Sequence, residues 1–198
     1  MVPAAPWRSV IDAVLWCHPA TPAARDMLAP QLSARAGLPI TLGALIAYRE
    51  GPVGPYGEII GAPLLLRPLA GHVPFIAVDS EPSIAGGRAN WALPKVPARF
   101  DGDVGRPGRA TAVGDGWAVA VTAPARRRRL PFAGSVRCVQ VWPDGRPREF
   151  SVRVRGRARL GHATVEHRTV SALADWLVAG RHPAILLSGV QDVLPPRP

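Results

Sequence analysis

The chain has 198 residues, enough for one domain with a core of its own. A hydrophobic content of 47% excludes an intrinsically disordered chain, and no apolar run approaches the roughly 18 residues of a membrane helix, so we expect no membrane partner. The net charge of +10 leaves polyanion binding open, whereas Cys17 and Cys138 give neither a zinc spacing nor a disulfide framework.

The N-terminal half is dominated by strand-like runs. Residues 10–16 predict a first strand. Thr21 and Pro22 predict a helix start, with an N-cap followed by proline, and we expect this helix to stop or restart at Pro30 and to close at Gly37. Further strands are predicted at residues 40–49, 56–66 and 73–78, because turn residues separate these apolar runs.

Two hairpins are predicted in the second half. Asp115-Gly116 separates residues 109–113 from 117–122, and Asp144-Gly145 separates residues 136–142 from 149–160. Apolar residues at helical spacing then predict one amphipathic helix, capped by Thr169 and ended by Gly180. We expect residues 194–198 to be loose.

Many strands and few helices predict a mainly β (α+β) fold, an antiparallel barrel-like sheet with a few peripheral helices, in a single domain over residues 1–198. No nucleotide-binding glycine motif, phosphate loop or repeat is found. The five histidines, His72 among them as an ordinary surface residue, show no ligand spacing, so neither a metal nor a cofactor is expected. Residues 1–6 lack the features of a secretory signal, which favours the cytoplasm.

Arginine is concentrated in two features. Arg126, Arg127, Arg128 and Arg129 are consecutive, and Arg153, Arg155, Arg157 and Arg159 alternate along a predicted strand with apolar residues on its other face. We interpret the first as a loop tip and the second as a solvated face or a subunit contact. Because no aromatic residues are interleaved as stacking platforms, we do not expect nucleic acid as a partner.

Lys95 is the only lysine among the 24 basic residues. An ammonium can lose its proton when desolvated, whereas a guanidinium stays protonated. With Trp91, Leu93 and Val96 close by in the sequence, Lys95 is a candidate amine nucleophile. The alternative is a single lysine retained by chance on an exposed loop.

The residues around Lys95 form a longer motif, Asp79-x-Glu81-Pro82-x-Ile84-Ala85-x-Gly87-Arg88, followed by Pro94-Lys95. This pattern resembles the acetoacetate decarboxylase family, in which the matching lysine forms a Schiff base. Upstream, Tyr56-Gly57-Glu58 resembles the family's Tyr-x-Glu, whose carboxylate lies near the catalytic amine. The resemblance is clear from about residue 53 to 97 and diffuse elsewhere.

The resemblance implies a closed, cone-shaped β-barrel with the lysine inside it, usually assembled into homo-oligomers. It implies a lyase that decarboxylates a small 3-keto acid through Lys95, with Glu58 as acid and base. Tyr56, Arg88, Trp91 and Leu93 are then candidate substrate-binding residues. Arg88 could clamp the substrate carboxylate or position the loop, and we expect the second role. The family has a further arginine near its N-terminus, and Arg8 is the candidate match, but we expect Arg8 to be an ordinary surface residue.

Three departures from the family pattern keep alternatives open. The family's second lysine is replaced by Val96, the glutamate after Gly-Arg by Ala89, and the aromatic residue before Pro-Lys by Leu93. One alternative is an aldolase-dehydratase that activates pyruvate on the same lysine. The others are a relative that binds a small carbonyl compound without catalysis, and an arginine-driven polyanion binder.

Overall fold

The structure is a computed structural model that describes residues 2–26, 28–32, 37–66, 69–105, 108–123, 128–169 and 173–197. Its strands are β1 (Trp7–Pro19), β2 (Gly37–Glu50), β3 (Tyr56–Leu66), β4 (Leu69–His72), β5 (Phe75–Val78), β6 (Lys95–Pro97), β7 (Arg99–Asp101), β8 (Arg109–Gly114), β9 (Trp117–Thr122), β10 (Leu130–Val141), β11 (Pro147–Thr169) and β12 (Gly180–Val193). Its helices are α1 (Pro22–Asp26), the 3-10 turn η1 (Pro30–Leu32), α2 (Glu81–Trp91) and α3 (Leu173–Trp176).

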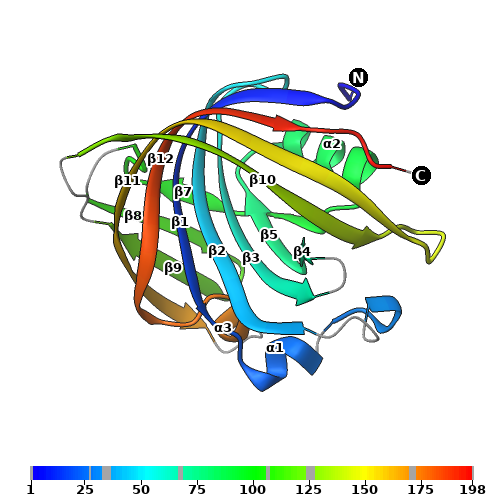
Figure 1. Cartoon of the computed structure of the whole chain (residues 1–198), viewed down its shortest axis with the longest axis horizontal. Coiled ribbons are helices and arrows are strands. Elements are labelled where there is room, and N and C mark those ends of the chain that lie inside the picture. Colours follow the sequence, from blue (N-terminus) through cyan, green and yellow to red (C-terminus); the bar gives the residue numbers. More distant parts are fainter. Residues whose placement is uncertain are drawn as a thin grey trace.

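All twelve strands belong to one strongly curved sheet (Figure 1). Hydrogen bonding joins them in the order β10-β4-β3-β2-β1-β12-β11-β9-β8-β7, with β5 pairing β3 and β6 pairing β5. Strand β10 also pairs with β11 over twelve residue pairs, from Leu130 opposite Ala158 to Val141 opposite Pro147. The mainly β prediction with few helices is therefore confirmed, whereas the prediction of a purely antiparallel sheet is wrong, because β10 pairs with β4 and β5 pairs with β6 in parallel.

The central strands separate two apolar interiors because successive side chains point to opposite faces. On β1, Ile11 and Ala13 pack into one interior, whereas Val14 and Trp16 pack into the other. The second interior is closed by β8, β9 and α3, which contribute Ala112, Val119 and Trp176 among other buried residues. The first interior faces β10 and the first half of β11, and it contains the candidate site described below.

Strands β11 and β12 run along both interiors and meet at two glycines. Gly156 lies opposite Gly189 in the register, and a Cβ at either residue would come within 2.2 Å of a backbone oxygen of the other strand. No side chain fits there, so this close approach requires glycine. Arg153, Arg155 and Arg157 are exposed, as the alternation predicts. The prediction fails at the end of the run, where Arg159 is half-buried and Leu160 is exposed.

Most sequence-predicted strands are confirmed. Strand β3 has the predicted bounds, β1 and β2 extend beyond theirs, and both Asp-Gly hairpins are formed, with Gly116 and Gly145 at positive φ. The predicted run 73–78 contains only β5, because β4 ends at His72. His72 is buried rather than on the surface, with its Nδ1 3.1 Å from the Val139 carbonyl oxygen.

The helix predictions are partly wrong. Thr21 caps α1 as expected, accepting a hydrogen bond from the Ala24 amide, but Gly37 begins β2 instead of closing a helix. Thr169 ends β11, the described helix α3 ends at Trp176, and Gly180 begins β12 instead of ending the helix. Residues 194–197 are not loose: the Leu194 and Arg197 amides donate to the Ser151 and Glu149 carbonyls.

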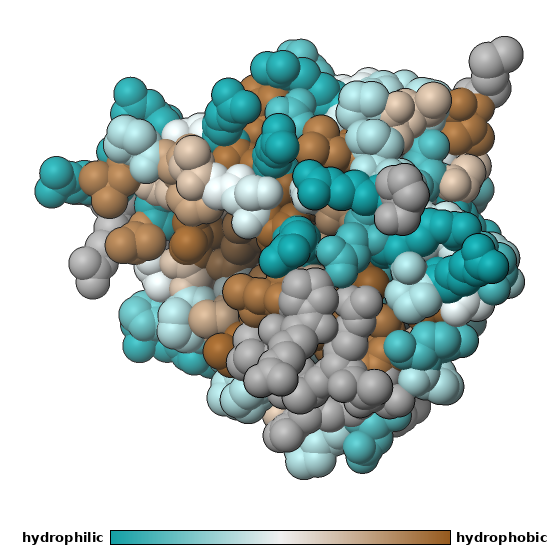
Figure 2. Space-filling view, turned by 45° about the vertical axis from the view of Figure 1, so that its right-hand side comes forward, coloured by the Kyte–Doolittle hydropathy of each residue, from teal (hydrophilic) through white to brown (hydrophobic). Residues whose placement is uncertain are grey.

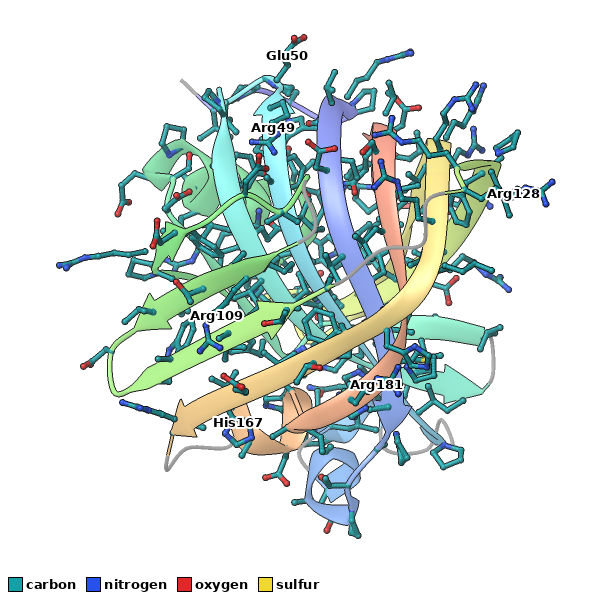
Figure 3. The ribbon with its side chains drawn as sticks, turned by 90° about the vertical axis from the view of Figure 1, so that its left-hand side faces the viewer. Arg49, Glu50, Arg109, Arg128, His167 and Arg181 are labelled. Atoms are coloured by element: carbon teal, nitrogen blue, oxygen red, sulfur yellow. The ribbon has the colours of Figure 1, made fainter. Side chains whose placement is uncertain are left out.

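Two of the four consecutive arginines, Arg128 and Arg129, lie within the described residues, and both are exposed. Arg126 and Arg127 fall outside the described residues, and Arg128 is exposed and projects from the body of the molecule (Figure 3).

Among the helices of the described ranges, none has the length and apolarity needed to cross a membrane.

Two buried histidines, His18 and His72, make the stability of the folded state depend on pH. Burial is the largest cause lowering the pKa of His18 below 6.5, and nearby His182 lowers it further, whereas the Pro19 and Trp176 carbonyls act in the opposite direction. Burial likewise lowers the pKa of His72. The unfolded chain therefore binds more protons than the folded chain below about pH 6.5, and the folded state loses stability as the pH falls through this range.

We expect the free energy of unfolding, measured by urea titration at several pH values, to decrease from pH 7 toward pH 5. His18→Gln should flatten this pH dependence because its side chain cannot take up a proton in either state. His167→Gln, at a half-buried residue near the end of β11 (Figure 3), is the matched control. An unchanged slope in His18→Gln would contradict the assignment.

Candidate active site

Helix α2 carries the centre of the lysine motif and is well specified at both ends. Ser80 is the N-cap, with its Oγ accepting from the Ser83 amide at 3.3 Å, and proline occupies the first turn. Ala92 ends the helix in the left-handed region, with φ of 52°, and its amide reaches the Arg88 carbonyl. The chain then turns into β6, which pairs in parallel with β5 and places Lys95 beside Ile76.

Lys95 points into the first interior and is 3% exposed. Its Nζ lies 2.6 Å from Glu58 Oε2 and 2.8 Å from Ser83 Oγ, and it sits 5.3 Å from the centre of the Tyr56 ring. Glu58 is 2% exposed, so both members of this ion pair are removed from solvent. A charged pair at this depth requires close hydrogen-bonded geometry, because each ion has lost its hydration.

The second oxygen of Glu58 is held by a chain of hydrogen bonds. The Tyr48 hydroxyl donates to Glu58 Oε1 at 2.9 Å, and Gln191 Nε2 on β12 donates to that hydroxyl at 2.9 Å. Tyr48 stacks on Tyr56 with ring centres 4.1 Å apart. Burial, followed by the charge of Glu58, raises the pKa of both tyrosines well above 10, so their hydroxyls stay protonated. Glu58 is thus fixed by one donor on each oxygen.

The position of the Lys95 side chain depends on a glycine of α2. A Cβ on Gly87 would lie 2.6 Å from Lys95 Cε and 2.7 Å from its Cδ, so the lysine methylenes pass directly over the bare helix backbone. Arg88 then fixes the main chain, with its Nη2 2.6 Å from the Lys95 carbonyl oxygen. Helix α2 therefore contacts Lys95 in three ways: the Ser83 hydroxyl contacts its amine, the backbone at Gly87 leaves room for its methylenes, and Arg88 binds its carbonyl oxygen.

A cavity of about 350 Å³ opens in front of Lys95. Its polar side chains are few and include Tyr48, Tyr56, Glu58 and Gln191, and the rest of its wall is mostly apolar. The apolar lining residues comprise Trp7, Leu15, Leu42, Ala44, Ile46, Ile60, Ala62, Val73, Ile76, Trp91, Leu93, Phe132, Val136, Cys138, Phe150, Val152, Val154 and Val193. A concave, apolar site with a few convergent polar groups is the usual form of a small-molecule site.

The structure brings most of the sequence-predicted site residues together. Tyr56, Trp91 and Leu93 line the cavity with Lys95 and Glu58, whereas Arg88 does not and contacts the Lys95 backbone instead. Val96, in place of the second family lysine, is on the outward side of β6 and 37% exposed. Arg8 is on the surface, with its side chain 76% exposed.

Three residues of the site were missed by sequence reasoning: Tyr48, Ser83 and Gln191. Ser83 lies inside the motif, where a hydroxyl one helical turn from Gly87 could have been noticed. Tyr48 pairs with Tyr56 across the β2–β3 hairpin, which an assumed register would have revealed. Nothing in the sequence marks Gln191. The described residues contain no group of three or more potential metal ligands.

Sequence comparison finds no relative. No model of a protein family matches the chain, and no curated protein is similar to it.

Comparison with solved structures is informative. The acetoacetate decarboxylase of Legionella pneumophila superposes with a TM-score of 0.68 at 17% identity, covering 98% of this chain and 86% of that one. The enduracididine biosynthesis enzyme MppR, in its complex with pyruvate, gives 0.64 at 16%, covering 100% and 91%. An acetoacetate decarboxylase-like enzyme from Sphingomonas wittichii RW1 gives 0.62 at 15%, covering 98% and 93%. The chain therefore has the acetoacetate decarboxylase-like fold over nearly its whole length.

Substituting Gly87 should displace the Lys95 amine. We expect Gly87→Ala to lower the melting temperature, because moving Lys95 away from its buried partner Glu58 outweighs the about 0.5–1 kcal/mol by which alanine favours a helix interior. The new methyl group should also change the rate at which acetic anhydride labels Lys95, measured by peptide mass spectrometry. Gly108→Ala, where a Cβ meets nothing within 4 Å, is the control. Equal labelling rates in both variants would refute the packing argument.

The Lys95–Glu58 pair should show strong coupling in unfolding experiments. Lys95→Met leaves Glu58 buried without its cation, which typically costs about 3–5 kcal/mol. The double variant Lys95→Met/Glu58→Gln should recover much of this loss, because neither charge then remains. Arg109→Met, which breaks the exposed Arg109–Glu166 pair (Figure 3), should change stability little. Additive effects of the two site substitutions would argue against a buried ion pair.

Proposed function

We propose that this chain is a Schiff-base-forming lyase that decarboxylates a 3-keto acid on Lys95. The observation that carries the proposal is a single buried amine, in contact with a fixed carboxylate, at the wall of an apolar cavity. The roles of Lys95 and Glu58, and of Tyr56, Trp91 and Leu93 as substrate contacts, belong to this proposal. So does a closed, cone-shaped barrel around the cavity, which the additional β10–β11 pairing would complete.

The first steps form the iminium. Glu58 accepts a proton from the Lys95 ammonium across their 2.6 Å contact, which leaves a neutral amine and a neutral acid in an apolar site. The amine attacks the ketone carbon and gives a carbinolamine. Glu58 returns its proton to the departing hydroxyl, water leaves, and a cationic imine joins the substrate to Lys95.

The second half breaks the carbon–carbon bond. The electron pair of the bond to the carboxylate moves into the imine, releasing carbon dioxide and leaving a neutral enamine. Glu58, now a carboxylate, takes a proton from solvent and passes it to the enamine carbon, and water then hydrolyses the cationic imine to release the ketone and restore the Lys95 ammonium beside Glu58. Tyr48 and Ser83 hold Glu58 and Lys95 in position throughout, since each contacts one of them directly.

An aldol-type reaction of pyruvate on the same lysine is a second candidate. It is favoured by the likeness to MppR, whose structures include a complex with pyruvate and one with a condensation product of pyruvate and imidazole 4-carboxaldehyde. The same amine and carboxylate would serve both reactions, and the partner of the enamine would differ: a proton in one case, an aldehyde in the other.

Borohydride trapping tests the shared step. With a productive keto acid, reduction should add one substrate residue per chain at Lys95. Trypsin should then fail to cleave after Lys95 and yield a single modified peptide spanning residues 89–99, which separates this adduct from any on the N-terminal amine. Lys95→Arg should abolish the adduct while circular dichroism remains unchanged.

Product analysis separates the candidates. Carbon dioxide released in proportion to enzyme supports decarboxylation, whereas a condensation product from pyruvate and an aldehyde supports the aldol reaction. If no 2- or 3-keto acid labels Lys95 from neutral to alkaline pH, the Schiff-base proposal is wrong, and the chain is a binding protein on this fold.

A further inference from the structure

We infer that the substrate is a 3-keto acid with a large apolar tail, an alkyl chain of several carbons or an aromatic ring, instead of a short keto acid. This inference rests on the proposed function and names the substrate class of the same site. It follows from the size, the lining and the charge balance of the cavity.

The cavity is too large for a four-carbon keto acid. Its volume of about 350 Å³ falls in the range of pockets that hold drug-sized ligands, about 300–1,000 Å³, whereas such an acid has only about seven non-hydrogen atoms. A short substrate would leave much of the space filled with water against apolar walls. An occupant with several more carbons would remove that water and fill the cavity.

The spare volume extends away from Lys95 along β3. Glu58, Ile60 and Ala62 are successive inward residues of this strand and all line the cavity, so its wall continues for about 13 Å beyond the ion pair. The distant end is lined by Leu42, which is paired with Ala62, and by Gly71. Among the residues that the structure describes, no charged side chain lines this part of the wall, so an apolar group fits its surface.

The cavity opens beside β10, where Ser135 and Val136 line it and are both exposed. Other hydrophobic side chains, including Leu130 on the same strand, are exposed as well. On the face drawn in Figure 2, hydrophobic residues gather in a band between hydrophilic margins. Val136 therefore gives the cavity an apolar edge where its wall meets solvent.

Charge balance gives an independent reason for a tail. Among the described residues, Lys95 is the only cation that lines the cavity, and it is already matched by Glu58. A substrate carboxylate bound here has no arginine to replace its lost hydration. Burial of a tail can offset this desolvation, and loss of carbon dioxide then removes the charge, so binding away from the reacting carbon promotes the chemical step.

A homologous series of substrates tests the inference. Acetoacetate, 3-oxohexanoate, 3-oxooctanoate and benzoylacetate are supplied to the unmodified protein, and both kcat/KM for carbon dioxide release, corrected for the spontaneous reaction, and the yield of the Lys95 adduct are measured. Each buried methylene should raise kcat/KM by about fourfold, and 3-oxooctanoate should exceed acetoacetate on the order of 100-fold.

A narrowed cavity provides the matched variant. Ala62→Leu places added bulk at the distant end, so it should reduce kcat/KM for 3-oxooctanoate at least tenfold and that for acetoacetate by a much smaller factor. Ala133→Leu, the same change at an exposed residue of β10 that does not line the cavity, should leave the whole series unchanged.

The outcomes separate the inference from the function on which it rests. If acetoacetate labels Lys95 and reacts as fast as the longer acids in the unmodified protein, the inference is overturned while the Schiff-base function stands. If no member of the series labels Lys95, the proposed Schiff-base function is wrong, and the inference about its substrate is wrong as well. An increase with chain length that Ala62→Leu abolishes supports both.

Discussion

The rest of the site depends on one constraint: an ammonium and a carboxylate 2.6 Å apart inside an apolar interior. Neither ion can be buried alone without a large loss of stability, so the two strands that carry them must meet in one register. Strand β5 enforces this, because it pairs with β3 beside Glu58 on one edge and with β6 beside Lys95 on the other. The donors around the pair then have fixed partners, and the site is preorganised before any substrate arrives.

The two faces of the central strands differ in how they are packed. One face of β1, β2 and β3 packs against β8, β9 and α3 in a closely filled core, while the other face is left with a cavity. The packed core supplies stability that the cavity side cannot, since empty space and buried ions both weaken a fold. A reactive site can thus be kept on a rigid sheet without being part of the packing that holds the sheet.

The sequence allowed prediction of the strands and of Lys95 with Glu58, because alternation, turn residues and a compact motif are local signals. It did not allow prediction of α2, since Pro82, Gly86 and Gly87 are typical of a turn. The structure shows that both glycines are required by packing: a Cβ would meet the Trp7 ring at Gly86 and Lys95 at Gly87. The role of Gln191 could not be predicted, because its contact with Tyr48 depends on the pairing of strands at opposite ends of the chain.

The burial of the sole lysine has a spectroscopic consequence. Protein grown with ¹⁵N-labelled lysine contains one labelled side-chain nitrogen, and its resonance needs no assignment. Because the Lys95 ammonium is shielded from solvent and held by Glu58 and Ser83, its protons exchange slowly enough with water to favour direct detection. The protonation state of a single buried amine can then be followed in the intact protein, an observation that lysine-rich proteins of similar size do not permit so directly.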